Sequence, residues 1–590
     1  MSEPQTKTCQ SCKNPFVIEP EDFDFYKKID VPPPTWCPDC RRQRRFTFRN
    51  ERTLYRRTCG LCGARILSNY SESAAATIYC NSCWWGDGWE GLEYGTPFDE
   101  TRPFFLQYAE LVRRVPQLNL WAFTNASSEY ANYTAYCKDV YLSYSILYSE
   151  DVLYSSHVDK SFHCVDCYKT IDSQYCYETV NSQRCYESKY LLYSKDCMNS
   201  SFLYNCANCD SCFMCANLRN KQYCIRGAQY SKESYAVELA KLGVNTTTGI
   251  AALRHEFTEL IRSSLRKYAN LIQTVDSTGD NLVNAKNAKN TFDSENVENI
   301  RYSWRLSNFK DAYDISGAID SELCYEVVVG GDKNYGCKFY AHGKGMRNVT
   351  FAQFCPEASN CFGCVGIKNK QYCILNTQYT KEEYEALVSK IREHMNTMPY
   401  VDRKGRVYRY GEFFPPELSP FAYNETVAQE SFPLSEEQAL EAGYTWKDPD
   451  TKEYTVTKAA LDLPNASAAI PDAIIDDVIG CAHGGACLEQ CTTAFRIVPQ
   501  ELEFYRRMGL PLPHLCPNCR HYERLKLKNP LKTWRRTCMC SGKESSNGTY
   551  TNTVSHDHGI EACTNEFETS FAPDRTETVY CEQCFNAEVI

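Results

Sequence analysis

Pairs of cysteines with the spacing C-x-x-C constrain this chain more than any other feature of its sequence. Eight of its 35 cysteines form four such pairs near the N-terminus, at Cys9/Cys12, Cys37/Cys40, Cys59/Cys62 and Cys80/Cys83. A two-residue gap lets both sulfurs bind one tetrahedral Zn²⁺, and two pairs close a structural site that has no open position. We therefore predict one zinc ion between the first two pairs and another between the last two. A cross-braced pairing fits the spacing as well.

The C-terminal region repeats this pattern. Cys12 and Cys37 are 25 residues apart, as are Cys491 and Cys516, and the following intervals of 19 and 18 residues also recur. Both copies contain the motif P-x-x-C-P-x-C-R. These matches indicate an internal duplication of one module. The ligands predicted for the second copy are Cys487, Cys491, Cys516 and Cys519, followed by Cys538, Cys563, Cys581 and Cys584.

Two departures leave the ligand set of the second copy open. Cys487 and Cys491 have the looser spacing C-x-x-x-C, and Cys481 and His483 lie just before them. An insert precedes Cys563, and it carries two histidines shortly after Cys540. The competing ligands are therefore Cys481, His483, Cys540, His556 and His558. For each of them, packing in a loop is the simpler interpretation.

A basic segment follows the fourth cysteine of the first site in each copy. Residues 41–57 carry a formal charge of +7 and residues 520–536 one of +6, although the whole chain is −10. Arginines between aromatic residues suit contacts with phosphates and stacked bases, which predicts two local faces for RNA or DNA. The alternative is that the arginines neutralise the anionic zinc centres. The candidate nucleic-acid residues are Arg41, Arg42, Arg44, Arg45, Arg49, Arg520, Arg524, Lys526 and Lys528.

The middle of the chain is a second kind of repeat. Valine or cysteine recurs in a polar-x-[VC]-[YLM] frame between Val140 and Cys209, mostly in steps of 12 residues. Short β elements at this period, separated by polar turns, indicate a stacked β-solenoid or a similar coil. Most of the cysteines in this repeat would then face inward and pack as small apolar residues.

This repeat is also duplicated. The spacing C-x5-C-x2-C-x8-C closes the first copy and returns 149 residues later, together with the shared sequence NKQYCI. The retained cysteines are either a further metal site in each copy or a cysteine-rich end cap. They are Cys206, Cys212, Cys215 and Cys224 in the first copy and Cys355, Cys361, Cys364 and Cys373 in the second.

Helical patterns follow each copy, and a segment punctuated by proline precedes the C-terminal cysteines. The expected fold is mainly β with some α, with treble-clef or zinc-ribbon modules at both ends of a duplicated Tyr- and Cys-rich β-solenoid-like repeat with helical caps. The expected divisions are 1–116 and 481–590 for the double zinc modules, 117–228 and 281–377 for the repeats, 229–280 and 378–400 for helices, and 401–480 for a linker.

Motifs of common enzymes are absent from the sequence. It contains no phosphate-binding loop, no dinucleotide-binding fingerprint, no H-E-x-x-H and no G-x-S-x-G. We therefore expect no catalytic residue and no cofactor other than zinc. A solenoid enzyme acting on carbohydrates, with carboxylates paired across turns, is the less favoured alternative. The N-terminal residues do not resemble a signal peptide and no membrane span is evident, so we expect a cytoplasmic protein with reduced cysteines.

The N-terminal run CQSCKNPFVIEPEDFDFYKKIDVPPPTWCPDCRRQRR and the tail CTTAFRIVPQELEFYRRMGLPLPHLCPNCRHYERLK resemble a probable zinc-ribbon family. Its members are large uncharacterised multi-zinc-ribbon proteins of uncultured small-genome bacteria. The resemblance extends over nearly the whole chain and implies metal-binding cysteines at the positions given above. It implies no activity.

Together these patterns predict a zinc-binding, non-enzymatic scaffold. It would hold about four zinc ions, or six if both C-x5-C-x2-C-x8-C motifs bind metal. In the leading hypothesis its basic faces bind nucleic acid or a ribonucleoprotein. In the alternative it is a protein–protein adaptor that uses the tyrosine-rich surface of the repeat.

Overall fold

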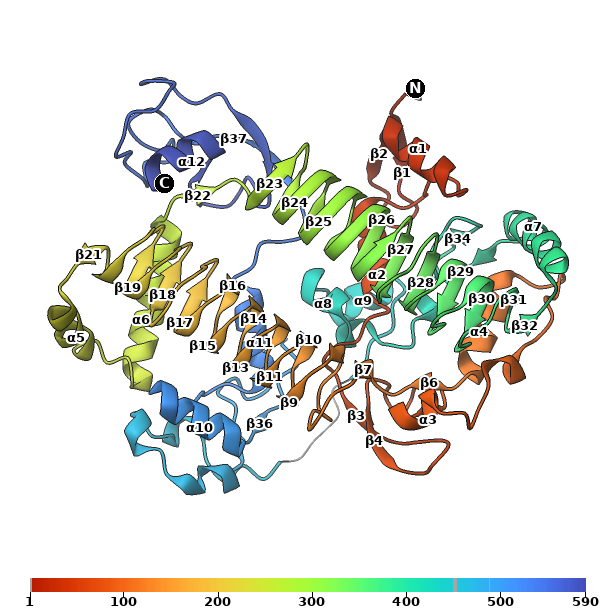
Figure 1. Cartoon of the computed structure of the whole chain (residues 1–590), viewed down its shortest axis with the longest axis horizontal. Helices are drawn as coiled ribbons and strands as arrows, with labels where there is room; N and C mark the ends of the chain where they lie inside the picture. Colours follow the sequence, from red (N-terminus) through yellow and green to blue (C-terminus); the bar gives the residue numbers. More distant parts are fainter. Residues whose placement is uncertain (1–2, 449–453, 488) are drawn as a thin grey trace. The chain divides into compact units, whose positions relative to one another are not determined.

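The computed structural model describes residues 3–448, 454–487 and 489–590, which form two compact units. One unit combines the described residues up to Leu120 with Ala269–Lys447 and Leu531–Thr533. The other combines Trp121–Tyr268 with the described residues of 448–530 and with Trp534–Ile590. The N-terminal cysteine module thus folds with the second copy of the repeat, and the C-terminal module folds with the first copy (Figure 1).

Each cysteine module uses one local design twice, a short antiparallel hairpin followed by a helix. The hairpins are β1 (Gln5–Thr8) with β2 (Pro15–Ile18), β3 (Tyr55–Thr58) with β4 (Arg65–Ser68), β35 (Ile479–Gly480) with β36 (Ala494–Phe495), and β37 (Trp534–Thr537) with β38 (Glu566–Thr569). The helices are α2 (Pro38–Phe46), α3 (Asn81–Trp85), α11 (Pro517–Leu525) and α12 (Glu582–Val589). An additional helix lies between hairpin and helix in the first half of each module, α1 (Pro20–Lys28) or α10 (Pro499–Met508).

The first copy of the repeat is a large curled sheet whose strands are almost all parallel. Its strands are β7 (Ala122–Phe123), β8 (Thr134–Ala135), β9 (Lys138–Tyr141), β10 (Tyr144–Leu147), β11 (Glu150–Leu153), β12 (Ser156–Asp159), β13 (Phe162–Val165), β14 (Tyr168–Ile171), β15 (Gln174–Tyr177), β16 (Val180–Gln183), β17 (Tyr186–Leu192), β18 (Ser201–Tyr204), β19 (Asp210–Ala216), β20 (Gln222–Ile225) and β21 (Ala228–Gln229). We call one circuit of the chain around the curled sheet a turn. Residues that lie beside each other on successive turns are 12 positions apart in sequence, as in the hydrogen bond from the Val140 amide to the Ser128 hydroxyl. The 12-residue step of the sequence is therefore the length of one turn.

The interior of this sheet follows a shorter period that the sequence analysis did not detect. Buried core residues such as Val140, Ile146, Val152 and Val158 lie at multiples of three residues from one another. The residue just before each of these four has a positive φ, as at Asp139 and Asp151. A left-handed residue in every group of three bends the chain repeatedly, so four inward side chains fit into one turn.

The second copy builds a similar curled sheet in the other unit. Its strands are β23 (Leu271–Val275), β24 (Gly279–Lys289), β25 (Thr291–Arg301), β26 (Trp304–Glu322), β27 (Tyr325–Gly330), β28 (Lys338–Gly343), β29 (Arg347–Gln353), β30 (Ser359–Val365), β31 (Cys373–Ile374) and β32 (Thr377–Gln378). Asparagine occupies many of its left-handed positions, and Asn284 donates to Asn296 one turn away, which in turn donates to Asn308. Asparagine tolerates this conformation better than most residues, which explains its enrichment here.

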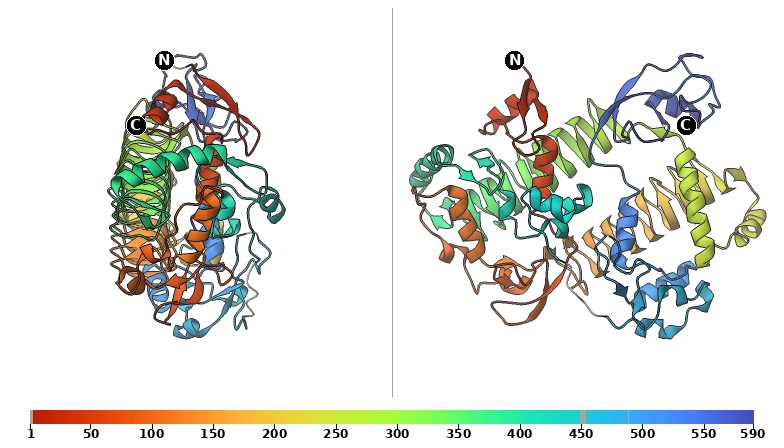
Figure 2. Two further views of the ribbon diagram at one scale, coloured as in Figure 1. Left: turned by 90° about the vertical axis from the view of Figure 1, so that its right-hand side faces the viewer. Right: turned by 180° about the vertical axis from the view of Figure 1, so that it is seen from behind.

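Helices cover parts of both sheets. α4 (Phe104–Arg114) contacts β30, and α7 (Lys381–Thr397) contacts β31 at the last turn of the second sheet (Figure 2). α5 (Lys232–Ala240) contacts β20, and α6 (Thr247–Ser263) contacts β19 of the first sheet. The segment predicted as a linker contains the short helices α8 (Val427–Ser431) and α9 (Glu436–Glu441), and Ala428 and Ala439 are buried in a core with Phe46 and Trp304.

The observed fold is mainly β with some α, as predicted, and its terminal modules are rich in cysteine. Each repeat is a large curled parallel sheet. Among the described residues, no helix is long and apolar enough to cross a membrane.

Candidate metal centres

Among the described residues, the predicted zinc-binding regions contain four groups of four cysteines whose sulfurs lie within 4.8 Å of one another. They are Cys9, Cys12, Cys37 and Cys40 (site 1), Cys59, Cys62, Cys80 and Cys83 (site 2), Cys481, Cys491, Cys516 and Cys519 (site 3), and Cys538, Cys563, Cys581 and Cys584 (site 4). The grouping joins neighbouring pairs and is not cross-braced. A fifth group combines Cys540, His556, His558 and Cys584.

The sulfur spacing fits a tetrahedral zinc ion. The second and third cysteines of the four sites have Sγ–Sγ distances of 3.8, 3.9, 3.9 and 3.9 Å, in chain order. A tetrahedron with Zn–S bonds of about 2.3 Å has S–S edges of about 3.8 Å. The residues present therefore fit a thiophilic metal of the size of zinc.

The backbone closes all four sites in the same way. The amide of the third cysteine donates to the Sγ of the first, over 3.2 to 3.3 Å, in Cys37–Cys9, Cys80–Cys59, Cys516–Cys481 and Cys581–Cys538. The third cysteine is also the N-cap of the helix, and the fourth lies in its first turn. The positive end of each helix therefore faces the sulfurs and stabilises thiolates, the form that binds metal.

One cysteine in each site has a lowered pKa. A hydrogen bond from the neighbouring Cys538 thiol lowers the pKa of Cys581 to about 4. Thiol donors likewise lower the pKa of Cys9, chiefly Cys37, and of Cys516, chiefly Cys481. At Cys59, backbone donors outweigh the opposing effect of burial and lower the pKa to about 6. Each cluster thus favours at least one thiolate before any metal charge is added.

Site 3 corrects the predicted ligand set, because Cys481 takes the position predicted for Cys487. Cys481 follows strand β35 as Cys9 follows β1, and its Sγ accepts the third-cysteine amide as Cys9 does. Cys481 is buried, whereas Cys487 is half-buried, with its Sγ 3.6 Å from that of Cys519. His483 lies 3.4 Å from the Glu489 carboxylate. The position of Cys481 after a short strand was the available sequence signal, and the C-x-x-x-C spacing of Cys487 obscured it.

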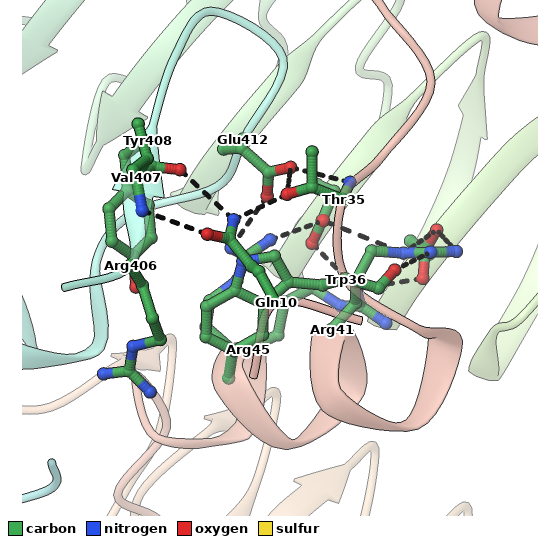
Figure 3. Close-up of polar contacts among 12 residues, drawn as sticks. Gln10, Thr35, Trp36, Arg41, Arg45, Arg406, Val407, Tyr408 and Glu412 are labelled. Carbon is green, nitrogen blue, oxygen red and sulfur yellow. Dashed lines mark hydrogen bonds and ion pairs between the residues drawn. The ribbon is translucent and has the colours of Figure 1, made fainter. Parts of the chain in front are cut away.

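The predicted nucleic-acid face of α2 is wrong for its arginines, which are enclosed within the first unit. Arg41, Arg42, Arg44, Arg45 and Arg49 are at most 3% exposed. Figure 3 shows Arg41 and Arg45 on α2 beside the segment that carries Glu412. Guanidinium groups buried in this way are not available to phosphates.

These arginines pair with buried carboxylates of the same unit. Arg41 Nη2 lies 2.8 Å from Asp314 Oδ2, and Arg45 Nη1 lies 2.8 Å from Glu326 Oε2. Arg44 bridges Glu326 and Glu412 at 2.9 and 3.0 Å. Burial raises the pKa of Glu326, although Arg44 and Arg45 oppose the rise. The basic helix therefore attaches the cysteine module to the second curled sheet.

The second unit repeats this attachment. Arg520 and Arg524 on α11 both lie 2.6 Å from the carboxylate of Asp166, which is fully buried on the first curled sheet. Both arginines are at most 5% exposed, so they too are unavailable to nucleic acid. The remaining candidates are Lys526, which is exposed and paired with Glu489 and Glu523, and Lys528, which lies over the ring of Tyr168.

A hydrogen bond from a sheet tyrosine to a carboxylate on the module also occurs in both units. Tyr302 donates to Asp22 on α1 over 3.0 Å, and Tyr154 donates to Glu501 on α10 over 2.8 Å. In each unit this tyrosine precedes the buried aspartate by one 12-residue turn, the spacing seen between bonded neighbours such as Asn299 and Asp311. Arg41 lies over Tyr302 and Arg520 over Tyr154.

The eight cysteines of the C-x5-C-x2-C-x8-C motifs are inward-facing core residues of the curled sheets, with exposures of 0 to 1%. Their thiols donate to backbone carbonyls nine residues further along the chain, as in Cys206 to Cys215 over 3.5 Å and Cys355 to Cys364 over 3.2 Å. Burial raises the pKa of Cys215 to about 11. Their complete burial in the apolar core of the sheets supports packing as the role of these residues.

A cavity of about 440 Å³ lies in the second unit, between the first curled sheet, α5 and α10. Tyr190, Phe202 and Phe213 form part of its apolar wall. Of the residues that line it, Glu187 alone carries a carboxylate, and that group lies 3.0 Å from Arg507 Nη2. The cavity thus lacks the pair of carboxylates that general acid–base hydrolysis of a glycoside requires.

Comparisons with known proteins give no family assignment. No protein-family model matches the chain, and no curated protein matches it. The cysteine clusters are compatible with zinc-ribbon-like modules on their geometry alone.

Proposed function

We propose that this protein is a zinc-binding, non-enzymatic cytoplasmic scaffold whose curled sheets are β-solenoids. The observation that carries the proposal is the set of four cysteine clusters with a common closing geometry. Four thiolate ligands saturate a tetrahedral zinc ion and leave no position for a substrate, which is the arrangement of a structural site.

The duplicated attachment of the modules supports a scaffold role. Each basic helix fixes its module to a sheet through ion pairs that are buried at both partners, as in Arg41–Asp314 and Arg520–Asp166. Zinc would order the hairpin and helix of each module, and the ordered helix would present its arginines to the sheet. Metal binding and the assembly of each unit are coupled in this proposal.

Metal analysis of the full-length protein, purified under reducing conditions, tests the proposal. At least four zinc ions per chain are expected. A metal content near zero in a folded protein would contradict it.

A protein–protein adaptor role is the second candidate, favoured by exposed side chains on the first curled sheet. Phe162, Tyr186 and Met198 share one register position along the sheet and are 38 to 47% exposed. Tyr136 and Tyr148 stack in parallel at 5.0 Å and are more than half exposed. Exposed aromatic groups of this kind are typical of interface cores.

Affinity capture with the full-length chain tests the adaptor role. A Tyr136→Ser/Tyr148→Ser double variant should lose a protein partner that the wild type retains after nuclease treatment. Nucleic-acid binding is the competing prediction, and its residues are now reduced to the lysines after α11. A gel shift at low salt that weakens steeply as salt is added would favour nucleic acid over the adaptor role.

A further inference from the structure

The insert before Cys563 has no counterpart in the N-terminal module, and it brings two histidines to the edge of site 4. Ligand atoms of Cys540, His556, His558 and Cys584 lie within 4.8 Å of one another. Cys584 also belongs to site 4. We propose that site 4 is one half of a two-metal cluster, in which Cys584 bridges a tetrathiolate zinc to a second zinc held by Cys540, His556 and His558.

The first argument is the hydrogen bonding of the two imidazole rings. His556 Nε2 lies 2.8 Å from the Glu588 carboxylate, and His558 Nδ1 lies 2.8 Å from the Glu561 carbonyl oxygen. Both partners only accept hydrogen bonds, so each of these ring nitrogens carries the proton. The nitrogen of each ring that could face a metal is therefore the other one, His556 Nδ1 and His558 Nε2.

Such an arrangement is the usual outer shell of a metal-bound histidine. A carboxylate or a backbone carbonyl on one nitrogen fixes the tautomer and the ring orientation, and the other nitrogen binds the metal. The second nitrogen of His558, Nε2, lies 3.3 Å from Cys584 Sγ, its hydrogen-bond partner. In a tetrahedral site with Zn–N of about 2.0 Å and Zn–S of about 2.3 Å, two such ligand atoms are about 3.5 Å apart.

The second argument is the burial of the cluster. Cys540 is 1% exposed, and the side chains of His556 and Glu588 are 1% and 0% exposed. Asn552 from the insert donates to Cys540 Sγ over 3.2 Å, which orients that sulfur. Buried polar groups with this much directed bonding indicate a built site and not a loop that packs by chance.

Charge balance also favours two metals. One zinc with four thiolates carries a formal charge of −2, and a second zinc with one more thiolate and two neutral imidazoles brings the total to −1. A bridging thiolate is thus shared by two cations, and the buried Glu588 carboxylate lies against His556 beside them. The second metal would fold the insert onto helix α12.

The test is the number of zinc ions bound by the full-length protein, counted by native mass spectrometry with zinc as the only added metal. The wild type is expected to bind five. Cys540→Ser and His558→Ala should each lose one ion, or two if the metals bind cooperatively. His394→Ala, which changes a helix histidine bonded to the Glu100 carbonyl, is the matched control and should retain five.

Cobalt substitution gives an independent measurement. Two Co²⁺ ions joined by one thiolate couple magnetically, so the wild type should show less paramagnetic signal than its cobalt content requires, and Cys540→Ser should lose this deficit. The inference rests on the proposed zinc scaffold but fails separately from it. A wild-type count of four that does not change in the two variants would overturn the bridged cluster alone, whereas a count near zero would overturn the scaffold.

Discussion

Arg520 Nη1 lies 2.6 Å from Asp166 Oδ2, and neither side chain is more than 5% exposed. The pair recurs in the other unit as Arg41 and Asp314. Along the sequence, the two cysteine modules flank the two repeats. Each module packs on the sheet formed by the repeat that is further from it in sequence. The same buried ion pair is therefore present in both units, although each module packs on the more distant repeat. This indicates that the ion pair defines how module and sheet fit together.

Removal of Asp166 tests the strength of this attachment. Asp166→Ala removes the carboxylate that Arg520 and Arg524 share and leaves Arg520 only the more distant Glu501 at 3.4 Å. Breaking a buried pair in this way costs about 3–5 kcal/mol. The matched control is Asp196→Ala on the same sheet, because Asp196 pairs with the half-exposed Arg184. An exposed pair contributes less than about 1 kcal/mol. Denaturant unfolding measures the loss in free energy of unfolding for both variants. Equal losses would show that the buried pair has no special role.

Site 3 yields a prediction that separates two neighbouring cysteines. Cys481→Ser should lower the zinc content by one ion, because Cys481 Sγ accepts the Cys516 amide that closes the site. Cys487→Ser should leave the zinc content unchanged. Elemental analysis of the two variants decides between them, and the reverse result would restore Cys487 as the ligand.

The interior cysteines should behave as apolar core residues. Cys361→Ala removes one buried heavy atom from the second sheet and should cost about 0.5–1.5 kcal/mol, as comparable core deletions do. Its zinc content should equal that of the wild type. Cys80→Ala, which removes a site 2 ligand, is the contrasting variant and should lose one zinc ion. Loss of zinc from Cys361→Ala would show that the inward cysteines bind metal.

A buried lysine predicts a pH effect on stability. Burial lowers the pKa of Lys189 to about 8 from its ordinary 10.5, while its ammonium group donates to the Met508 carbonyl. Below pH 8 the lysine is charged in both states. Between these two pKa values the unfolded chain binds more protons, so the contribution of Lys189 to the free energy of unfolding rises with pH.

Urea unfolding under reducing conditions measures this effect as the difference in stability between the wild type and Lys189→Met. The free energy of unfolding of the wild type should rise relative to that of Lys189→Met between about pH 7.5 and pH 10. Lys338, which donates to the Ile29 carbonyl and has a pKa lowered by burial to about 8, provides the equivalent variant in the other unit. A difference that does not change with pH would mean that Lys189 keeps its ordinary pKa when folded.

The sequence predicted the cysteine modules well because metal ligands must recur at fixed spacing, and the duplication follows from those intervals. The intervals left both a neighbouring and a cross-braced pairing open, and only the folded chain groups neighbouring pairs. The sequence also predicted the 12-residue turn. It did not reveal the three-residue spacing of inward side chains, because serine, cysteine, threonine and valine all occupy those positions. The left-handed residues between them are equally varied and include tyrosine and lysine as well as asparagine.

The arginines were misassigned for a physical reason. A cluster such as Arg41, Arg44 and Arg45 looks like a phosphate-binding surface until its carboxylate partners are known. Those partners, Asp314 and Glu326, are more than 250 residues away in sequence and lie on strands that no local pattern connects with α2. Only the folded chain shows that the charges are internal.

X-ray absorption at the zinc edge tests the central claim most directly. The account predicts a first shell made mostly of sulfur at about 2.3 Å, with a small nitrogen contribution from the histidines of the fifth group. A shell dominated by nitrogen or oxygen, in protein that is folded and reduced, would contradict the assignment of closed cysteine sites.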